Sequence, residues 1–253
     1  MESIVLCEVI KPGNITDAYE KAINENPHNR PSSTSGRQKR SVGKHTKFWT
    51  PGRTLRIAFL NGDQKFKQTV KDAAAAWETH INLNFDFVEG TQGDIRISSN
   101  TYSYYASTIG TDALLIDDPD EPTMHIGTDY WWDRYIPNII HEFGHMLGLE
   151  HEHLHPQCNI PWDKPALYQS RGVLDESNPV YAPTKEQVDA AFLNLLDLSE
   201  VNFSPYDSKS IMHYEIRQQW TIGDFKVDFN YTLSDADKAF VSQVYPQPEA
   251  QSE

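Results

Sequence analysis

The chain has 253 residues, 38% of them hydrophobic and 23% charged, which is typical of a globular protein that can bury a substantial core in one domain or two. No apolar run approaches the roughly 18–20 residues that a membrane-spanning helix needs, so we expect no membrane span. The net charge of −14 comes from the region after residue 47, and such an acidic surface disfavours nucleic acids and anionic membranes as partners.

Residues 1–47 differ from the rest and are predicted to be an N-terminal extension or prosegment with a linker. They hold 8 Lys/Arg against 5 Asp/Glu. Residues 14–24 are expected to form a short helix that is capped near Thr16 and Asp17, whereas residues 26–47 are rich in Asn, Pro, Ser, Gly and basic side chains. Within this linker, residues 37–40 (RQKR) have the form of a dibasic processing site, and a solvated charge cluster is the alternative.

The first ten residues are not typical of a secretory signal. The apolar run 4–10 is short, contains Glu8, and lacks both a basic start and a small-residue cleavage site. If the protein is exported, a signal has been removed or another route is used.

From Phe48 the pattern becomes regular, and residues 48–247 are predicted to form one domain followed by a tail, 248–253. Alternating apolar and polar residues predict a strand at 54–60, and further strands are predicted at 83–88, 94–98, 113–116 and 123–126. Apolar residues at helical spacing predict helices at 63–81, 183–196 and 234–244, and another that begins between 133 and 137. In that helix, we expect Ile136, Ile140 and Leu147 to face the core.

This order of elements predicts an α+β fold. A twisted mixed sheet with a backing helix and the helix after residue 133 would form an upper half, 48–148. The later residues show little sheet-like alternation, so 149–247 are expected to form an irregular lower half with a cleft between the two.

Residues 141–151 (HEFGHMLGLEH) have the spacing of a catalytic zinc site. On a helix, His141 and His145 share a face, so their ring nitrogens can bind one metal ion at roughly 2.0–2.1 Å. Glu142 is placed to reach a metal-bound water rather than the metal. Gly148 stands where a helix end needs a left-handed residue, and the resulting turn lets His151 return as a third ligand. The alternative is a helix with solvated histidines.

Residues 210–214 (SIMHY) agree with this assignment, because they resemble the methionine turn of the metzincin metalloproteases. In that superfamily the turn lies beneath the zinc site, and its methionine forms a soft apolar floor, which implies this position for Met212. An ordinary core segment is the alternative.

The detailed resemblance is to the astacin family of metzincins, and it covers residues 48–246. It rests on Glu152, which directly follows the third histidine, and on Tyr206, Asp207 and the SIMHY segment. The resemblance implies Zn²⁺ as cofactor and His141, His145 and His151 as its ligands. It also implies Tyr214 as an additional, displaceable ligand that hydrogen-bonds the transition state.

By this resemblance, the chain is expected to be a secreted, monomeric zinc endopeptidase that acts on proteins or peptides. Glu142 would be the general base. The alternative is a catalytically silent zinc-bearing module that binds other proteins. An edge strand between residues 109 and 116 is expected to pair with extended substrate, and cleavage after Arg40 would free an amine at Ser41 that reaches Glu152.

The cysteines and residue 155 depart from the family pattern and favour a divergent, microbial-type member. Most animal astacins carry four cysteines, whereas this chain has Cys7 and Cys158, and His155 stands where an arginine is usual. Three interpretations of the cysteines are open: they pair with each other, both are free thiols, or Cys7 is a thiolate that caps the zinc in a latent form.

Overall fold

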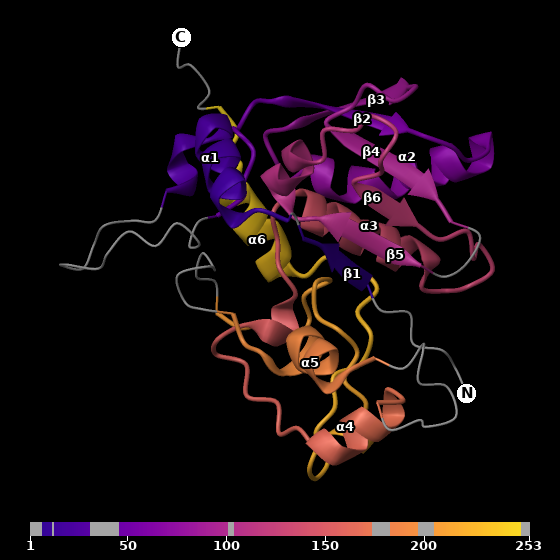
Figure 1. Cartoon of the computed structure of the whole chain (residues 1–253), viewed down its shortest axis with the longest axis vertical. Coiled ribbons are helices and arrows are strands. Elements are labelled where there is room, and N and C mark those ends of the chain that lie inside the picture. Colours follow the sequence, from indigo (N-terminus) through magenta and orange to yellow (C-terminus); the bar gives the residue numbers. More distant parts are fainter. Residues whose placement is uncertain are drawn as a thin grey trace, which may run out of the picture.

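The computed structural model describes residues 7–11, 13–30, 46–100, 104–173, 183–196 and 205–248. The upper half contains a six-stranded sheet in the order β1-β5-β6-β4-β2-β3 (Figure 1). Its strands are β1 (Cys7–Ile10), β2 (Thr54–Phe59), β3 (Asn84–Glu89), β4 (Ile95–Ser99), β5 (Tyr105–Thr108) and β6 (Met124–Ile126). The described pairs of neighbouring strands are parallel except β5 and β6, so the predicted mixed sheet is confirmed.

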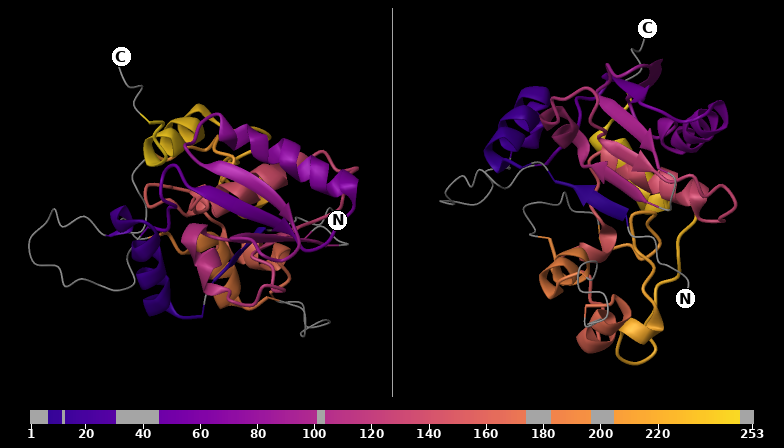
Figure 2. Two further views of the ribbon diagram at one scale, coloured as in Figure 1. Left: turned by 90° about the horizontal axis from the view of Figure 1, so that it is seen from above. Right: turned by 45° about the vertical axis from the view of Figure 1, so that its right-hand side comes forward.

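Two helices pack against each other on the sheet, and the second of them carries His141 and His145 (Figure 2). They are α2 (Gln64–Glu78) and α3 (Tyr135–Met146). The side chain of Asp63 caps α2 by accepting the amide of Phe66 at 2.7 Å. In α3, Ile139, Ile140 and Phe143 are buried.

Two expectations about this region are wrong. Ile136 is 42% exposed, because the first turn of α3 buries Tyr135 and Pro137 instead. Residues 113–116 are not a strand, because Gly110–Leu115 form a 3₁₀ helix. The carbonyl of Lys47 accepts the amide of Thr111 at 2.9 Å, and this bond turns the chain out of the sheet. Residues 109–116 therefore provide no edge strand, and the strand that precedes them, β5, pairs with β1 on one side and β6 on the other.

The N-terminal extension lies against the rest of the molecule. Its helix α1 (Ile15–Glu25) packs on the 3₁₀ helix Gly110–Leu115, and its N-cap is Asn14, whose side chain accepts the amide of Thr16 at 2.9 Å. The buried side chain of Asn29 bonds both the amide and the carbonyl of Phe48, at 2.9 and 2.8 Å. The proposed processing site at residues 37–40 lies outside the described residues.

The lower half has a small core of its own, built from Leu167, Val188, Phe192 and Trp220. Its helices are α4 (Lys164–Ser170) and α5 (Lys185–Val188), which lie below the sheet in Figure 1. α5 is shorter than expected, because the chain continues as a π-type turn over Asp189–Leu193. The last helix, α6 (Asp235–Val244), returns to the upper core.

Two side chains that are distant in sequence donate hydrogen bonds to backbone carbonyls at the C-terminal end of α3. The ring nitrogen of Trp49 donates to the carbonyl of Met146 at 2.8 Å, and the hydroxyl of Tyr245 donates to that of Leu147 at 2.7 Å. These bonds satisfy carbonyls that a helix end leaves without partners. No helix in the described part of the chain is long and apolar enough to cross a membrane.

Candidate metal centre

The three predicted metal ligands converge because α3 ends in a tight turn. His141 and His145 lie one turn apart on α3. Gly148 follows with φ +95°, in the left-handed region that favours glycine, and a Cβ there would lie 2.7 Å from the ring of Phe48. The chain therefore reverses, and His151 returns to the same centre.

Backbone carbonyls determine which nitrogen of each helical imidazole faces this centre. Nδ1 of His141 lies 2.8 Å from the carbonyl oxygen of Ile211, and Nδ1 of His145 lies 2.8 Å from that of Leu149. Because a carbonyl oxygen can only accept, both Nδ1 atoms carry the proton, and both Nε2 atoms keep a lone pair. Nε2 of His145 lies 3.0 Å from Nε2 of His151.

The assembled atoms fit a zinc ion. One donor atom each from Cys7, His141, His145 and His151 lies within 4.8 Å of all the others. Nε2 of His141 is buried and has no hydrogen-bond partner among the described residues, so its lone pair is unused. Imidazole nitrogen and thiolate sulfur are the ligands that zinc prefers.

Burial keeps the imidazoles neutral and ready to bind a cation. It lowers the pKa of His141 to about 4. For His145 and His151, burial and then the neighbouring imidazoles hold the pKa well below the ordinary value. Protons therefore do not compete with a metal ion near neutral pH.

Glu142 lies in the same buried centre without being a member of the ligand cluster. Its side chain is fully buried, and the thiol of Cys7 lies near enough to its carboxyl group to affect its ionisation. Burial raises its pKa well above the usual range. A carboxyl group in this environment is suited to exchanging a proton.

The segment around Met212 packs directly beneath α3. A Cβ on Gly144 would lie only 2.3 Å from the sulfur of Met212, so the helix needs a glycine at the point of contact. The carbonyl of Met212 also accepts the amide of Glu152 at 3.0 Å. The sequence motif does not reveal this role of Gly144, because it depends on a residue 68 positions away.

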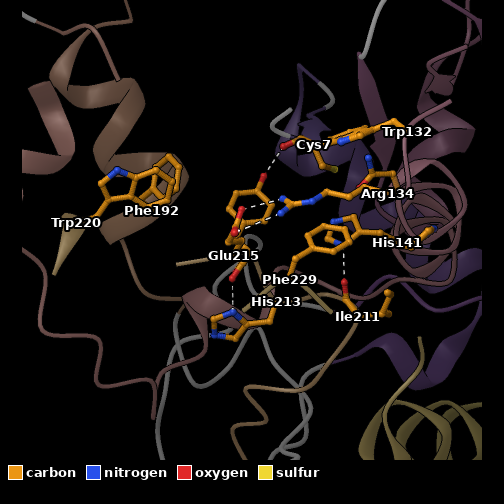
Figure 3. A pocket seen from close by; sticks show the side chains of 13 residues that line it. Cys7, Trp132, Arg134, His141, Phe192, Ile211, His213, Glu215, Trp220 and Phe229 are labelled. Carbon is orange, nitrogen blue, oxygen red and sulfur yellow. Dashed lines mark hydrogen bonds and ion pairs between the residues drawn. The ribbon is translucent and has the colours of Figure 1, made fainter. Parts of the chain in front are cut away.

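Tyr214 lies against the site, and its hydroxyl donates a hydrogen bond to the backbone carbonyl of Cys7 (Figure 3). Its ring centroid is 4.3 Å from that of His151 and 4.2 Å from that of His153. Burial, followed by the charges of Cys7 and Glu142, raises the pKa of Tyr214 well above its usual value. The phenol is therefore a hydrogen-bond donor at neutral pH.

The remaining candidates lie around this centre with partners of their own. Oε1 of Glu152 accepts the amide of Asp207 at 2.8 Å, and burial raises the pKa of Glu152 to about 7. His153 contacts the carbonyl of Ala191 at 2.8 Å and is not part of the cluster. Ser41, the expected partner of Glu152, lies outside the described residues.

The sequence reasoning overlooked Asp237, which supports the site from α6. Its carboxylate accepts the hydroxyl of Ser210 at 2.6 Å and the amide of Ile211 at 2.8 Å. The spacing of Ser234 and Asp237 is visible as a helix-capping signal, and both capping bonds form. The contact with the methionine turn has no such signal, because it joins residues that are far apart in sequence.

Known proteins resemble this chain in sequence and in structure. No family model matched the sequence. The zinc metalloproteinase nas-24 of Caenorhabditis elegans is 29% identical over 120 residues, which are 47% of this chain and 29% of that protein. The chain spans only 29% to 37% of the length of the curated relatives it matches.

The solved structures cover more of the fold. The structure of myroilysin has a TM-score of 0.73 and 33% identity, and the match covers 80% of this chain and 97% of that one. A hatching-enzyme zinc protease of the medaka fish Oryzias latipes, HCE-1, has a TM-score of 0.53 at 17% identity over 80% of this chain and 96% of that one, and it supports the fold alone. The predicted α+β metzincin fold is thereby confirmed.

Myroilysin matches this chain at 33% identity over 97% of its own length, and the curated relatives are zinc metalloproteinases. The histidine cluster of this chain is compatible with a zinc site of the same kind. The chain belongs to the astacin family of zinc metalloproteases.

Proposed function

We propose that this chain is a zinc-dependent endopeptidase that hydrolyses internal peptide bonds of proteins or peptides. The main support is that three imidazole nitrogens from His141, His145 and His151 face one centre, beside the buried carboxyl group of Glu142. A Zn²⁺ ion held there would polarise the scissile carbonyl and lower the pKa of a bound water toward about 7.

Glu142 would move the proton. A nearby divalent cation favours the carboxylate form, so Glu142 would accept a proton from the attacking water and deliver it to the leaving amine. The support is its position one residue after His141 and its complete burial beside the ligand cluster.

Tyr214 would donate a hydrogen bond to the developing oxyanion. The support is that its hydroxyl already donates to a backbone carbonyl beside the metal cluster, that of Cys7. With Cys7 gone, the hydroxyl would be free to contact substrate or to serve as the displaceable zinc ligand that the family resemblance implies.

We further propose that residues 1–47 are a prosegment that keeps residues 48–247 latent, with 48–148 as the upper and 149–247 as the lower half of the catalytic domain and 248–253 as a tail. Cys7 would bind the zinc as a fourth ligand. The support is that its sulfur lies within 4.8 Å of the three imidazole donors and that Cys7 and Cys158 are not joined in a disulfide. In addition, β1 pairs with β5 and so covers the strand that would bind substrate.

A silent zinc-bearing module is not supported. Such a module needs no general base, whereas Glu142 is intact, buried and next to the ligands. Astacin-type proteases are typically extracellular, and we propose that this one acts outside the cell, as a monomer on polypeptides rather than on nucleic acid.

The decisive experiment compares zinc content and casein digestion in wild type and Glu142→Ala, before and after cleavage within residues 31–45. We expect about one zinc per chain in both, because Glu142 is not a ligand. Digestion should appear only in the cleaved wild type, with a loss of about 10²–10⁴-fold or more in the variant. The exposed Glu89→Gln is the matched control. Equal digestion by wild type and Glu142→Ala would reject the proposal.

The role of Cys7 has a test that does not depend on activity. Co²⁺ replaces Zn²⁺ at such sites, and a thiolate bound to Co²⁺ has a charge-transfer absorption band. We expect this band in the intact chain, its loss in Cys7→Ser, and its retention in Cys158→Ser. Rapid alkylation of Cys7 in the metal-loaded intact chain would argue against the cap.

A further inference from the structure

The backbone of Tyr214, the proposed oxyanion donor, is held by the residue that precedes it. Nδ1 of His213 lies 2.6 Å from the carbonyl oxygen of Tyr214 (Figure 3). Because a carbonyl oxygen can only accept, Nδ1 carries the proton of this imidazole. Burial lowers the pKa of His213 to about 4, so the ring is neutral near pH 7 and its Nε2 offers a lone pair. The bond to Tyr214 therefore requires His213 in one tautomer.

The hydroxyl group of Tyr206 selects this tautomer. It lies 2.8 Å from Nε2 of His213, and it must donate there because Nε2 has no proton. The thiol of Cys158 is close enough to the same phenol to affect its ionisation. Since the one hydrogen of the phenol is directed at His213, the thiol can only donate to the phenol oxygen. A directed series of hydrogen bonds thus runs from Cys158 through Tyr206 and His213 to the backbone of Tyr214.

The segment that carries Tyr206 is fixed next to the third histidine ligand. The following residue, Asp207, donates its amide to Oε1 of Glu152 at 2.8 Å, and its carbonyl accepts the amide of Ser210 at 3.1 Å. Tyr206 is thus tied to the residue that follows His151. Its hydroxyl group therefore connects two parts of the site, the end of the zinc-binding motif and the methionine turn.

The residue after Tyr214 is anchored as well. The carboxylate of Glu215 accepts two hydrogen bonds from the guanidinium of Arg134, at 2.8 and 3.3 Å, across a pocket beside the metal cluster (Figure 3). The backbone of Tyr214 is therefore held on both sides. Its hydroxyl, which here donates to the carbonyl of Cys7, would reach substrate by rotation of the side chain alone.

We propose that Tyr206 is a positioning residue for the reaction: through His213, it fixes Tyr214 where its hydroxyl can stabilise the transition state. This inference rests on the proposed endopeptidase function. A donor of this kind must lie roughly 2.7–3.1 Å from the developing oxyanion, so a displaced backbone costs rate. Because the oxyanion exists only in the transition state, the affinity for substrate is not affected.

The experiment is a double-mutant cycle on the zinc-loaded chain after cleavage within residues 31–45, with one fluorogenic peptide that wild type cleaves. Tyr214→Phe removes the donor and should lower kcat about 10²–10³-fold. Tyr206→Phe leaves the donor present but misplaced, so kcat should fall about tenfold with KM unchanged. In the Tyr214→Phe background, Tyr206→Phe should have no further effect, because no donor is left to misplace.

Two controls separate positioning from a general loss of structure. Tyr168→Phe removes a similar hydroxyl bond in the lower half, to Asp189 at 2.5 Å, and should leave kcat unchanged. Zinc affinity, measured by competition with a chromophoric chelator, should be the same in Tyr206→Phe as in wild type. A structural defect would instead lower kcat by the same factor in both backgrounds, and this result would overturn the proposal. An unchanged kcat in Tyr206→Phe would overturn it too.

A second cycle uses the intact chain and needs no activity. There the hydroxyl of Tyr214 donates to the carbonyl of Cys7, so a misplaced Tyr214 should hold Cys7 less firmly. We expect Tyr206→Phe and Tyr214→Phe each to speed alkylation of Cys7 about 2- to 10-fold, and the double variant to react no faster than Tyr214→Phe. An alkylation rate that does not respond to Tyr206→Phe would contradict the proposal.

The two cycles also separate this proposal from the proposed function. The absence of cleavage by zinc-loaded, processed wild type would reject the endopeptidase function. Alkylation of Cys7 in the intact chain would still decide whether Tyr206 acts on Tyr214. Cleavage by wild type with additive effects of the two variants would leave the endopeptidase function standing and reject the positioning role of Tyr206.

Discussion

At the scale of single residues, the site depends on a close contact between a helix and the methionine turn that leaves little room for a side chain. Gly144 lies in the middle of α3, where glycine normally destabilises a helix by about 1 kcal/mol relative to alanine. Here the position faces the sulfur of Met212, and an added Cβ would lie 2.3 Å from it. The absence of a side chain lets the methionine turn approach the helix that carries His141 and His145.

We therefore predict that Gly144→Ala destabilises the protein despite its higher helix propensity. Overpacking of this kind costs about 1–3 kcal/mol, which denaturant unfolding would measure. Gly144→Ala combined with Met212→Ala should recover part of the loss relative to the sum of the single variants. Gly13→Ala, where the added Cβ meets no atom within 4 Å, is the control. A Gly144→Ala variant as stable as wild type would show that Met212 can move freely.

At the scale of elements, α6 supports the metal site across the molecule. Asp237, in the first turn of α6, accepts the amide of Ile211, and the carbonyl of Ile211 accepts Nδ1–H of His141. Three elements are thus joined in series: the C-terminal helix, the methionine turn and α3. Partners behind a metal ligand orient its ring, and their loss typically lowers metal affinity about 10–100-fold.

Asp237→Ala should accordingly weaken zinc binding by about 10–100-fold, with a smaller effect in Asp237→Asn, which keeps one accepting oxygen. Competition with a chromophoric chelator would measure the affinity of each folded variant. Asp235→Ala removes the neighbouring exposed carboxylate of α6 and serves as the control. Unaltered zinc affinity in Asp237→Ala, with loss of stability alone, would limit Asp237 to capping the helix.

At the scale of the whole molecule, the cleft concentrates buried titratable groups, and this determines how the protein responds to acid. Among the described residues, burial lowers the pKa of six histidines, five of them around the cleft (His141, His145, His151, His153 and His213) and one in β6 (His125). As the pH falls below about 6.5, the unfolded chain takes up protons on these histidines that the folded chain cannot, so each one contributes to a loss of stability. Four buried carboxyls with raised pKa values, Glu142, Glu152, Asp112 and Asp237, oppose this effect, because the folded chain binds their protons first.

We expect the six histidines to outweigh the four carboxyls, so the metal-free chain should lose stability as the pH falls from about 6.5 toward 4. Each unopposed histidine contributes up to about 1.4 kcal/mol per pH unit. Saturating zinc should extend the stable range to lower pH, because the ion binds only the neutral imidazoles. Melting temperatures recorded against pH, with and without a chelator, would measure both effects. A metal-free melting temperature that is flat over this range would contradict the expected balance.

The convergence of His141, His145 and His151 could be predicted from the sequence, because their geometry is local. The four-residue spacing of His141 and His145 puts both on one helical face, and Gly148 reverses the chain over three residues to return His151. Strands and helices with clear periodicity, such as β2 and α2, were predictable for the same reason.

Contacts between distant segments could not be predicted from the sequence and are seen only in the folded protein. Periodicity could not show that residues 110–115 leave the sheet, because the carbonyl of Lys47, more than 60 positions earlier, accepts the amide of Thr111. Nor could it show that Arg134 and Glu215 meet across a pocket or that Cys7 lies beside the histidines. Such pairings depend on how the sheet, the helices and the lower half pack together, and residues far apart along the chain leave no common spacing from which they could be inferred.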